Sequence, residues 1–144
     1  MIFVTVGTTE FNTLIKKADA LKNEDLVIQY ADGEYQPKNY PAFNFSDEIS
    51  HYYKNAEIII THGGAGTIFK LLGLGKKIIG MANLERTDKH QTDLLKKLSD
   101  EGYLIWCQDP NRLKDCIKKA REIKLKKYSP PKSNIAAAIQ EFLR

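Results

Sequence analysis

A strand, a glycine-rich turn and a helix follow one another between Ala56 and Gly75, and this stretch limits the possible folds most. Residues 57–61 (EIIIT) form a β-branched run, long enough for a strand that is buried on both faces. The turn HGGAGT then places three glycines in four positions, so the backbone can turn sharply and approach a ligand closely. A helical pattern follows from Thr67, and its N-terminus would present free N–H groups to a phosphate.

The same turn is also compatible with a strand-to-helix connection that binds nothing. Its pattern is neither G-x-G-x-x-G nor a P-loop, because no Gly-Lys-Ser/Thr follows it. The turn alone therefore leaves the question of ligand binding open.

The chain has the size and composition of one globular domain. Its 144 residues are enough for a hydrophobic core, and 28% of them are charged, which is ordinary for a soluble protein. No apolar run approaches the ~18 residues of a membrane span, and residues 2–6 are too short for a signal peptide. Cys107 and Cys116 form no C-x-x-C motif, which favours a reduced cytosolic protein. We expect a single domain over residues 1–144.

The formal net charge of +4 is unevenly distributed. Residues 1–110 hold 12 Lys/Arg and 15 Asp/Glu, a net charge of −3, whereas residues 111–144 hold 10 and 3, a net charge of +7. Such a basic end can face nucleic acid, an anionic membrane or an acidic partner, or it can be a solvated helix face. Nucleic acid is disfavoured, because the basic end has no aromatic stacking platform.

Strand-like and helix-like segments alternate along the chain. Besides the strand before the glycine turn, strands are predicted at residues 1–6, 26–30, 42–45, 77–81 and 103–106. Helices are predicted at residues 11–21, 48–55, 67–74, 90–101, from Asp109 onwards and at 134–143. This order, without an internal repeat or a linker, predicts an α/β fold, a Rossmann-like, doubly wound parallel sheet of about six strands.

Four loops of this predicted sheet lie at the carboxyl ends of its strands. They comprise residues 7–9, 45–46, 62–67 and 82–91. Doubly wound sheets bind their ligands at this edge, where the strand order switches. The convergence of the loops therefore predicts a nucleotide-like ligand. Two caps are predicted at the same edge, Thr8 or Thr9 for the first helix and Ser46 or Asp47 for the second.

Five motifs occur in an order and at a spacing that resemble a known family. They are FVTVGTT near the N-terminus, FNFSDEI, ITHGGAGTI, GKKII, and the HQ of DKHQTDLL. Together they resemble the C-terminal half of a GT-B glycosyltransferase, of the glycosyltransferase family 28 C-terminal type, over about residues 1–107. That family includes the catalytic subunit of the dolichol-pathway UDP-N-acetylglucosamine transferase and bacterial exopolysaccharide glycosyltransferase subunits.

The resemblance implies that the chain is one GT-B half-domain that binds a UDP-sugar as donor substrate, without a metal or another cofactor. It implies an inverting hexosyltransferase that adds a hexose or N-acetylhexosamine to a lipid-diphosphate-linked sugar. A membrane-associated partner subunit would supply the other half and recruit this cytoplasmic chain to the cytoplasmic membrane face. The alternative is a non-catalytic member of the family that enhances or stabilises its partner.

The resemblance also assigns a role to each loop. The loop at Phe45 and Ser46 would contact the uracil. Gly64, Ala65, Gly66 and Thr67 of the glycine-rich turn would hold the diphosphate at the helix N-terminus. His62 and Gly63, which begin the same turn, would belong to the residues that bind the nucleotide sugar. The first turn would close over it with Gly7, Thr8 and Thr9. His90, the candidate catalytic residue, and Gln91 would reach the sugar or phosphate, although His90 is nearly as well explained as a helix cap and His62 as a strand cap.

The helix after the glycine turn departs from the family at one position. Members commonly have a carboxylate there, five residues before the closing glycine, to hold the ribose hydroxyls, and this chain has Lys70. A lysine has only donors and cannot accept from a hydroxyl. Either the ribose is held otherwise, for example by Glu85 or Asp88, or donor binding is weakened, or the nucleotide differs. Lys70 can equally be a plain solvent-facing residue.

The segment at residues 134–143 predicts a short terminal helix with one apolar face. Helices of this length are marginal in water, so the face needs a surface to cover it. Its own domain and the partner half are both compatible with this pattern.

Overall fold

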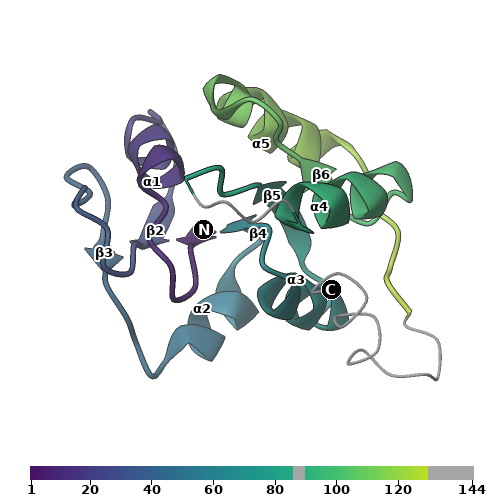
Figure 1. The fold of residues 1–144 in the computed structure, drawn as a ribbon, viewed down its shortest axis with the longest axis horizontal. Coiled ribbons are helices and arrows are strands. Elements are labelled where there is room, and N and C mark those ends of the chain that lie inside the picture. The colour runs from purple at the N-terminus through teal and green to yellow at the C-terminus, as the bar shows by residue number, and fades with distance from the viewer. Residues whose placement is uncertain (86–89, 130–144) are drawn as a thin grey trace.

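The structure is a computed structural model, and it describes residues 1–85 and 90–129. Its centre is a sheet of six strands in the order β3-β2-β1-β4-β5-β6, with every neighbouring pair parallel (Figure 1). The strands are β1 (Ile2–Thr5), β2 (Leu26–Gln29), β3 (Ala42–Phe43), β4 (Ile58–His62), β5 (Lys77–Met81) and β6 (Ile105–Trp106). The predicted doubly wound sheet is confirmed.

Helices cover both faces of the sheet. They are α1 (Asn12–Asp19), α2 (Ile49–Asn55), α3 (Ala65–Gly73), α4 (His90–Asp100) and α5 (Leu113–Glu122), with a 3-10 turn η1 (Pro110–Arg112) before the last. Helices α1 and α5 lie on one face and α2, α3 and α4 on the other (Figure 1). The terminal helix predicted at residues 134–143 lies outside the described residues.

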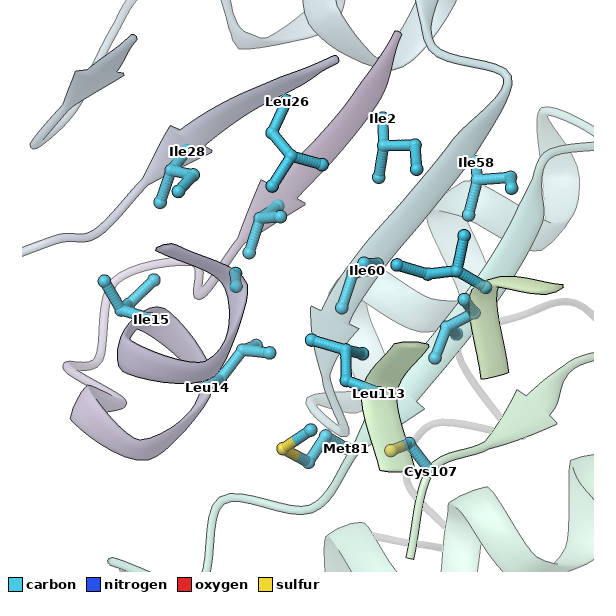
Figure 2. Close-up of a cluster of buried hydrophobic side chains, with 14 of the residues drawn as sticks. Ile2, Leu14, Ile15, Leu26, Ile28, Ile58, Ile60, Met81, Cys107 and Leu113 are labelled. Atoms are coloured by element: carbon cyan, nitrogen blue, oxygen red, sulfur yellow. The ribbon is translucent and has the colours of Figure 1, made fainter. Parts of the chain in front are cut away.

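The core consists of two clusters, one on each face of the sheet. Side chains of the central strands alternate between them: Ile2 and Val4 of β1 pack toward α1 and α5 (Figure 2), and Phe3 packs toward α2. Ile58 and Ile60 of β4 alternate with Ile59 in the same way. Burial on both faces explains the continuous apolar runs of these two strands.

The strand order reverses between β1 and β4. From β1 the chain continues through β2 to β3 in one direction, and β4, β5 and β6 then follow on the other side of β1. The carboxyl ends of β1 and β4 therefore flank the point at which sheets of this kind bind ligands.

Some element boundaries differ from the prediction. Strand β3 ends at Phe43, so Phe45 lies beyond it, and β6 begins only at Ile105. Helix α3 begins at Ala65, two residues early, because the extended Gly64 is its N-cap and accepts the N–H of Ile68 at 3.0 Å. The glycine-rich turn thus contains the first turn of the helix itself.

The predicted cap of α1 by Thr8 or Thr9 is wrong. Phe11 occupies the N-cap position without a side-chain hydrogen bond. The Glu85 carboxylate instead accepts the backbone N–H groups of Asn12 and Thr13, at 3.3 and 2.7 Å. The predicted cap of α2 by Ser46 or Asp47 is also wrong, since Glu48 is the N-cap without a side-chain hydrogen bond, and Ser46 Oγ accepts the N–H of Glu48 itself at 3.0 Å.

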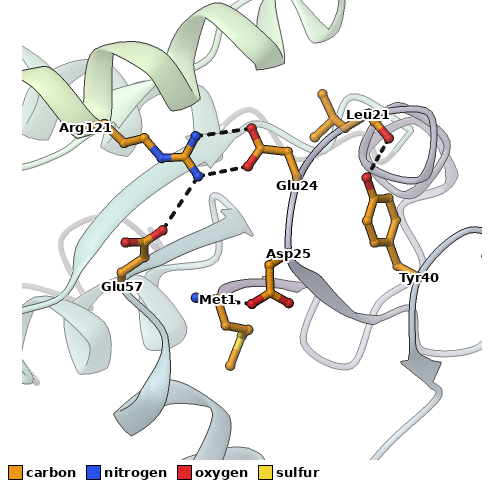
Figure 3. A network of polar contacts seen from close by, with 7 residues as sticks. All are labelled: Met1, Leu21, Glu24, Asp25, Tyr40, Glu57 and Arg121. Atoms are coloured by element: carbon orange, nitrogen blue, oxygen red, sulfur yellow. Dashed lines mark hydrogen bonds and ion pairs between the residues drawn. The ribbon is translucent and has the colours of Figure 1, made fainter.

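Polar contacts join the amino end of the sheet to the end of α5 (Figure 3). Arg121 pairs with both carboxylate oxygens of Glu24, at 3.2 and 2.8 Å, and lies 3.6 Å from Glu57. The Tyr40 hydroxyl donates to the Leu21 carbonyl at 2.6 Å. The carboxylates of Glu24 and Glu57 thus neutralise Arg121, which lies in the last turn of α5.

Candidate functional site

The imidazole of His62 lies between two glycine turns at the switch point. Its Nδ1 accepts the N–H of Gly64 at 3.0 Å, and a Cβ on Gly64 would overlap its Cε1. A Cβ on Gly7 would lie 2.9 Å from its Nε2. Gly7 also has a φ of +67°, a conformation that side chains disfavour. Both glycines therefore make room for the ring that joins the ends of β1 and β4.

His62 is neutral at pH 7 and carries its proton on Nε2. Burial lowers the pKa of the imidazole to about 4. Because Nδ1 accepts a hydrogen bond, the proton of the neutral ring must sit on Nε2. This buried Nε2–H has no acceptor among the described residues. Buried donors are nearly always paired, so an unpaired one at a ligand-binding edge points to an acceptor that comes with a ligand.

The first turn of α3 adds three backbone donors to the same place. In the described part of the chain, the N–H groups of Ala65, Gly66 and Thr67 have no acceptor, and no side chain caps the helix. The helix dipole places partial positive charge at this end. Free N–H groups and the dipole make this end of α3 a candidate anion site, and the preceding Gly64 lies against the imidazole of His62.

Gln29, at the end of β2, holds the first turn in position. Its Oε1 accepts from Thr5 Oγ1 at 2.6 Å and from the N–H groups of Val6 and Gly7 at 3.0 and 3.2 Å. Its Nε2 donates to the carbonyls of Gly7 and Asn44, both at 2.8 Å. Gln29 was not among the predicted site residues, although an amide at the end of the apolar run LVIQ was a signal.

Gln91 of α4 joins the ends of β4 and β5. Its Oε1 accepts the N–H groups of Gly63 and Asn83, at 3.0 and 2.9 Å. Asn83 Nδ2 in turn donates to the carbonyl of Glu10 at 2.9 Å. The side-chain oxygen of Gln91 is therefore occupied by the protein, whereas its Nε2 donates no hydrogen bond to another described residue.

These contacts bring the four predicted loops together. Gln29 links the loop after β3 to the Gly7 turn, His62 links that turn to the glycine-rich turn, and Gln91 links the latter to the loop after β5. His90 begins α4 beside Gln91. Phe45 is 52% exposed in the loop after β3, and Thr8 and Thr9 follow Gly7. The convergence that the sequence predicted is confirmed.

Three residues were discussed as possible contacts of the ribose, namely Glu85, Asp88 and Lys70. The Glu85 carboxylate is bound to the first turn of α1. Asp88 lies outside the described residues. Lys70 is exposed on α3, and its Nζ lies 5.7 Å from the ring centre of Tyr53 on α2.

The described residues contain no group of three or more His, Cys, Asp or Glu side chains arranged to hold a metal ion. None of their helices has the length and apolar character needed to cross a membrane.

The family model of the glycosyltransferase family 28 C-terminal domain matches residues 1–143. The chain belongs to this family. The human UDP-N-acetylglucosamine transferase subunit ALG13 is 30% identical over 122 residues, which are 74% of this chain and 11% of that protein. The UDP-N-acetylglucosamine–N-acetylmuramyl-(pentapeptide) pyrophosphoryl-undecaprenol N-acetylglucosamine transferase of Campylobacter jejuni is 32% identical over 105 residues, 71% of this chain and 31% of that protein. The chain thus spans only a minor part of these relatives.

Two solved structures share the fold. The NMR structure of ALG13 superposes with a TM-score of 0.65 at 20% identity, covering 98% of this chain and 94% of that one. The crystal structure of Acinetobacter baumannii MurG gives a TM-score of 0.66 at 18% identity, covering 99% of this chain and 49% of that one. The resemblance to a GT-B half-domain is confirmed.

Proposed function

We propose that the chain is the UDP-sugar-binding half of an inverting hexosyltransferase. The observation that carries this proposal is the neutral His62, whose Nε2–H lacks an acceptor beside three free N–H groups of α3. A diphosphate supplies the oxygens that this set of donors requires. The family relatives support UDP as the nucleotide, since two of them are named as UDP-N-acetylglucosamine transferases.

In the reaction, a hydroxyl oxygen of the acceptor attacks the anomeric carbon from the face opposite the diphosphate. The bond from this carbon to the diphosphate oxygen breaks, and its electron pair leaves with UDP. The donors at the switch point stabilise the charge that develops on the leaving group. His62 is not the base that takes the hydroxyl proton, because Nδ1 is occupied and Nε2 is already protonated. A base from the partner half, or His90 at the same edge, takes it.

The acceptor in this proposal is a lipid-diphosphate-linked sugar, to which a hexose or N-acetylhexosamine is added. A membrane-associated partner subunit binds this acceptor and recruits the cytoplasmic chain to the cytoplasmic membrane face. The names of the relatives support an acceptor of this class, since one of them transfers to a pyrophosphoryl-undecaprenol sugar.

A non-catalytic subunit is the second candidate, and Lys70 is the observation that favours it. A cation stands where the family commonly places its ribose-binding carboxylate, and it faces the ring of Tyr53. Turnover of a UDP-sugar by the chain together with its partner separates the two candidates. Catalysis requires that changes in the glycine-rich turn of this chain abolish turnover, whereas an enhancer would tolerate them.

Gly66→Val should weaken UDP binding while the domain stays folded. Apart from its chain neighbours and the backbone of its own helix, a Cβ at Gly66 meets no atom within 4 Å, so the added side chain occupies only space beside the free N–H groups of α3. We expect a loss of about 10- to 100-fold, because one charge-assisted hydrogen bond contributes about 1.5–3 kcal/mol. Titration calorimetry with UDP measures this loss.

Gly73→Val is the matched control. It lies at the other end of the same helix and also has no atom within 4 Å of its Cβ, so UDP affinity should be unchanged. Gly64 is unsuitable, since a Cβ there would displace His62. Equal UDP affinity in both variants would contradict the placement of the diphosphate at the first turn of α3.

Lys70→Glu should tighten UDP binding if Lys70 stands at the ribose. A carboxylate there accepts from the ribose hydroxyls, and such a bond contributes up to about 1–2 kcal/mol. The same calorimetric titration measures the gain. Lys70→Gln is the control, because it removes the cation without supplying a carboxylate. A gain in both variants would assign the effect to the lost cation, and no gain in either would place Lys70 away from the ribose.

A further inference from the structure

The last helix of the described chain has one apolar side and one basic side. Leu113, Ile117 and Ala120 recur at helical spacing and are buried against the sheet. The outward positions are rich in lysine, and the segment after the helix continues the same charge. Its exposed lysines are Lys114, Lys118, Lys119, Lys124, Lys126 and Lys127, which we call the α5 face.

The lysines of the α5 face are not neutralised by the protein. Among the described residues, the arginines of this region form its ion pairs, Arg112 with Asp115 and Arg121 with Glu24 and Glu57. None of the six lysines forms one. The only other carboxylate on α5 is that of Glu122, so most of the positive charge remains available to an anionic partner.

We propose that the α5 face binds the anionic headgroups of a lipid bilayer. The six lysines extend along a ten-residue helix, about 15 Å long, and the segment beyond it. A lysine is a point charge on a flexible side chain, so it can pair with a lipid phosphate without a fixed geometry. This suits a membrane surface, where the negative charge is diffuse. Each lysine near such a surface contributes about 1 kcal/mol of binding free energy, which strengthens binding about fivefold.

A groove lies where the segment after α5 passes the end of α3, a helix of the opposite face of the sheet. It has a volume of about 480 Å³, and its lining includes Lys124, Lys126, Lys127 and Leu74. The Leu74 side chain is 53% exposed beside these cations. Lysines around an exposed leucine suit the boundary between headgroups and acyl chains, where peripheral proteins insert apolar side chains.

The α5 face fits a nucleic acid less well than a bilayer. Sequence-tolerant binding of single strands uses aromatic side chains as stacking platforms, and α5 has none. The nearby Tyr128 packs against Tyr103, with ring centres 5.2 Å apart, and against Phe69, at 5.8 Å. The arginines that would grip phosphates bidentately are already paired with carboxylates.

Binding along α5 leaves the switch point accessible. Helix α5 starts near the carboxyl end of β6 and covers one face of the sheet, whereas the anion site of α3 lies at the sheet edge. The bilayer therefore lies beside the nucleotide site and does not cover it. The inference concerns a different surface from the proposed function and does not require UDP.

Vesicle flotation of the full chain tests the proposal. We expect the chain to float with vesicles that contain about 30% phosphatidylglycerol in phosphatidylcholine, and to detach as salt rises above about 0.1 M, where the screening length falls below about 10 Å. K118Q/K119Q removes two lysines of the α5 face, and its partition coefficient should fall about 30-fold.

The control K38Q/K54Q removes the same charge from the loop before β3 and from α2, where neither lysine forms an ion pair with another described residue, and it should change the partition coefficient less than about threefold. All four lysines are exposed, so both variants should fold, and circular dichroism checks this. Equal losses in the two variants would overturn the proposal. So would equal binding to pure phosphatidylcholine, or tighter binding to a DNA duplex at the same salt.

Discussion

Gln29→Leu should lower the free energy of unfolding by about 3–5 kcal/mol. The Gln29 side chain is 1% exposed and makes five hydrogen bonds at the carboxyl ends of β1 and β2. Leucine fills a similar volume but leaves the N–H of Val6 and the carbonyls of Gly7 and Asn44 without this partner, and the N–H of Gly7 keeps only its 3.4 Å contact with Thr5 Oγ1. Each buried group left without its partner costs about 1–3 kcal/mol. Urea unfolding followed by circular dichroism measures the change.

Gln108→Leu is the control for this substitution. Gln108 is exposed, so the same replacement of an amide by leucine takes place there at the surface. Its stability should stay within about 0.5 kcal/mol of the parent chain. The Gln29 variant should also bind UDP more weakly where it still folds, since the Gly7 turn loses its anchor. A loss of stability below about 1 kcal/mol would mean that water or a rearranged turn replaces the amide.

The elements that could be predicted from the sequence are those determined by residues close together in the chain. Strands β1 and β4 were predictable because burial on both faces demands an unbroken apolar run. The glycine-rich turn was predictable because the His62 ring leaves no room for a Cβ at Gly64. The convergence of the loops followed from the alternation of strands and helices, which puts every carboxyl end at one edge.

The features that the sequence did not reveal depend on residues far apart in the chain. Glu85 caps α1 from 72 residues away, so no local sequence pattern indicates this contact. The cap was predicted at Thr8 or Thr9 because these residues lie close to the helix in the sequence. Gln29 reaches Gly7 across 22 residues, and only the parallel register of β1 and β2 brings them together.

Asp19 is a third case of this kind. Its side chain is 1% exposed and accepts from the Tyr35 hydroxyl and the N–H groups of Lys38 and Asn39. Burial by itself would raise the pKa of this carboxyl, but these hydrogen bonds outweigh it and the pKa is lowered. A loop that the sequence showed only as polar and proline-containing is thereby fixed to the end of α1.

The pH dependence of stability should report the buried imidazole of His62. An unfolded histidine has a pKa of 6.5, and burial lowers the pKa of His62 to about 4 in the folded chain. Between these values the unfolded state binds a proton that the folded state rejects, so stability falls as the pH falls. The pKa shift corresponds to at most about 3 kcal/mol of unfolding free energy. The folded state has this stability in full above pH 6.5 and loses it on acidification to about pH 4.

Comparing the parent chain with His62→Asn isolates this effect, because asparagine does not titrate. Asp19 does not interfere, since its lowered pKa places its own loss of stability below its ordinary value of 3.8. We expect the difference in unfolding free energy between the two chains to change by about 3 kcal/mol from pH 6.5 to pH 4, as measured by urea unfolding. Parallel stability curves would show that His62 is solvated, and its Nε2–H would then need no ligand oxygen.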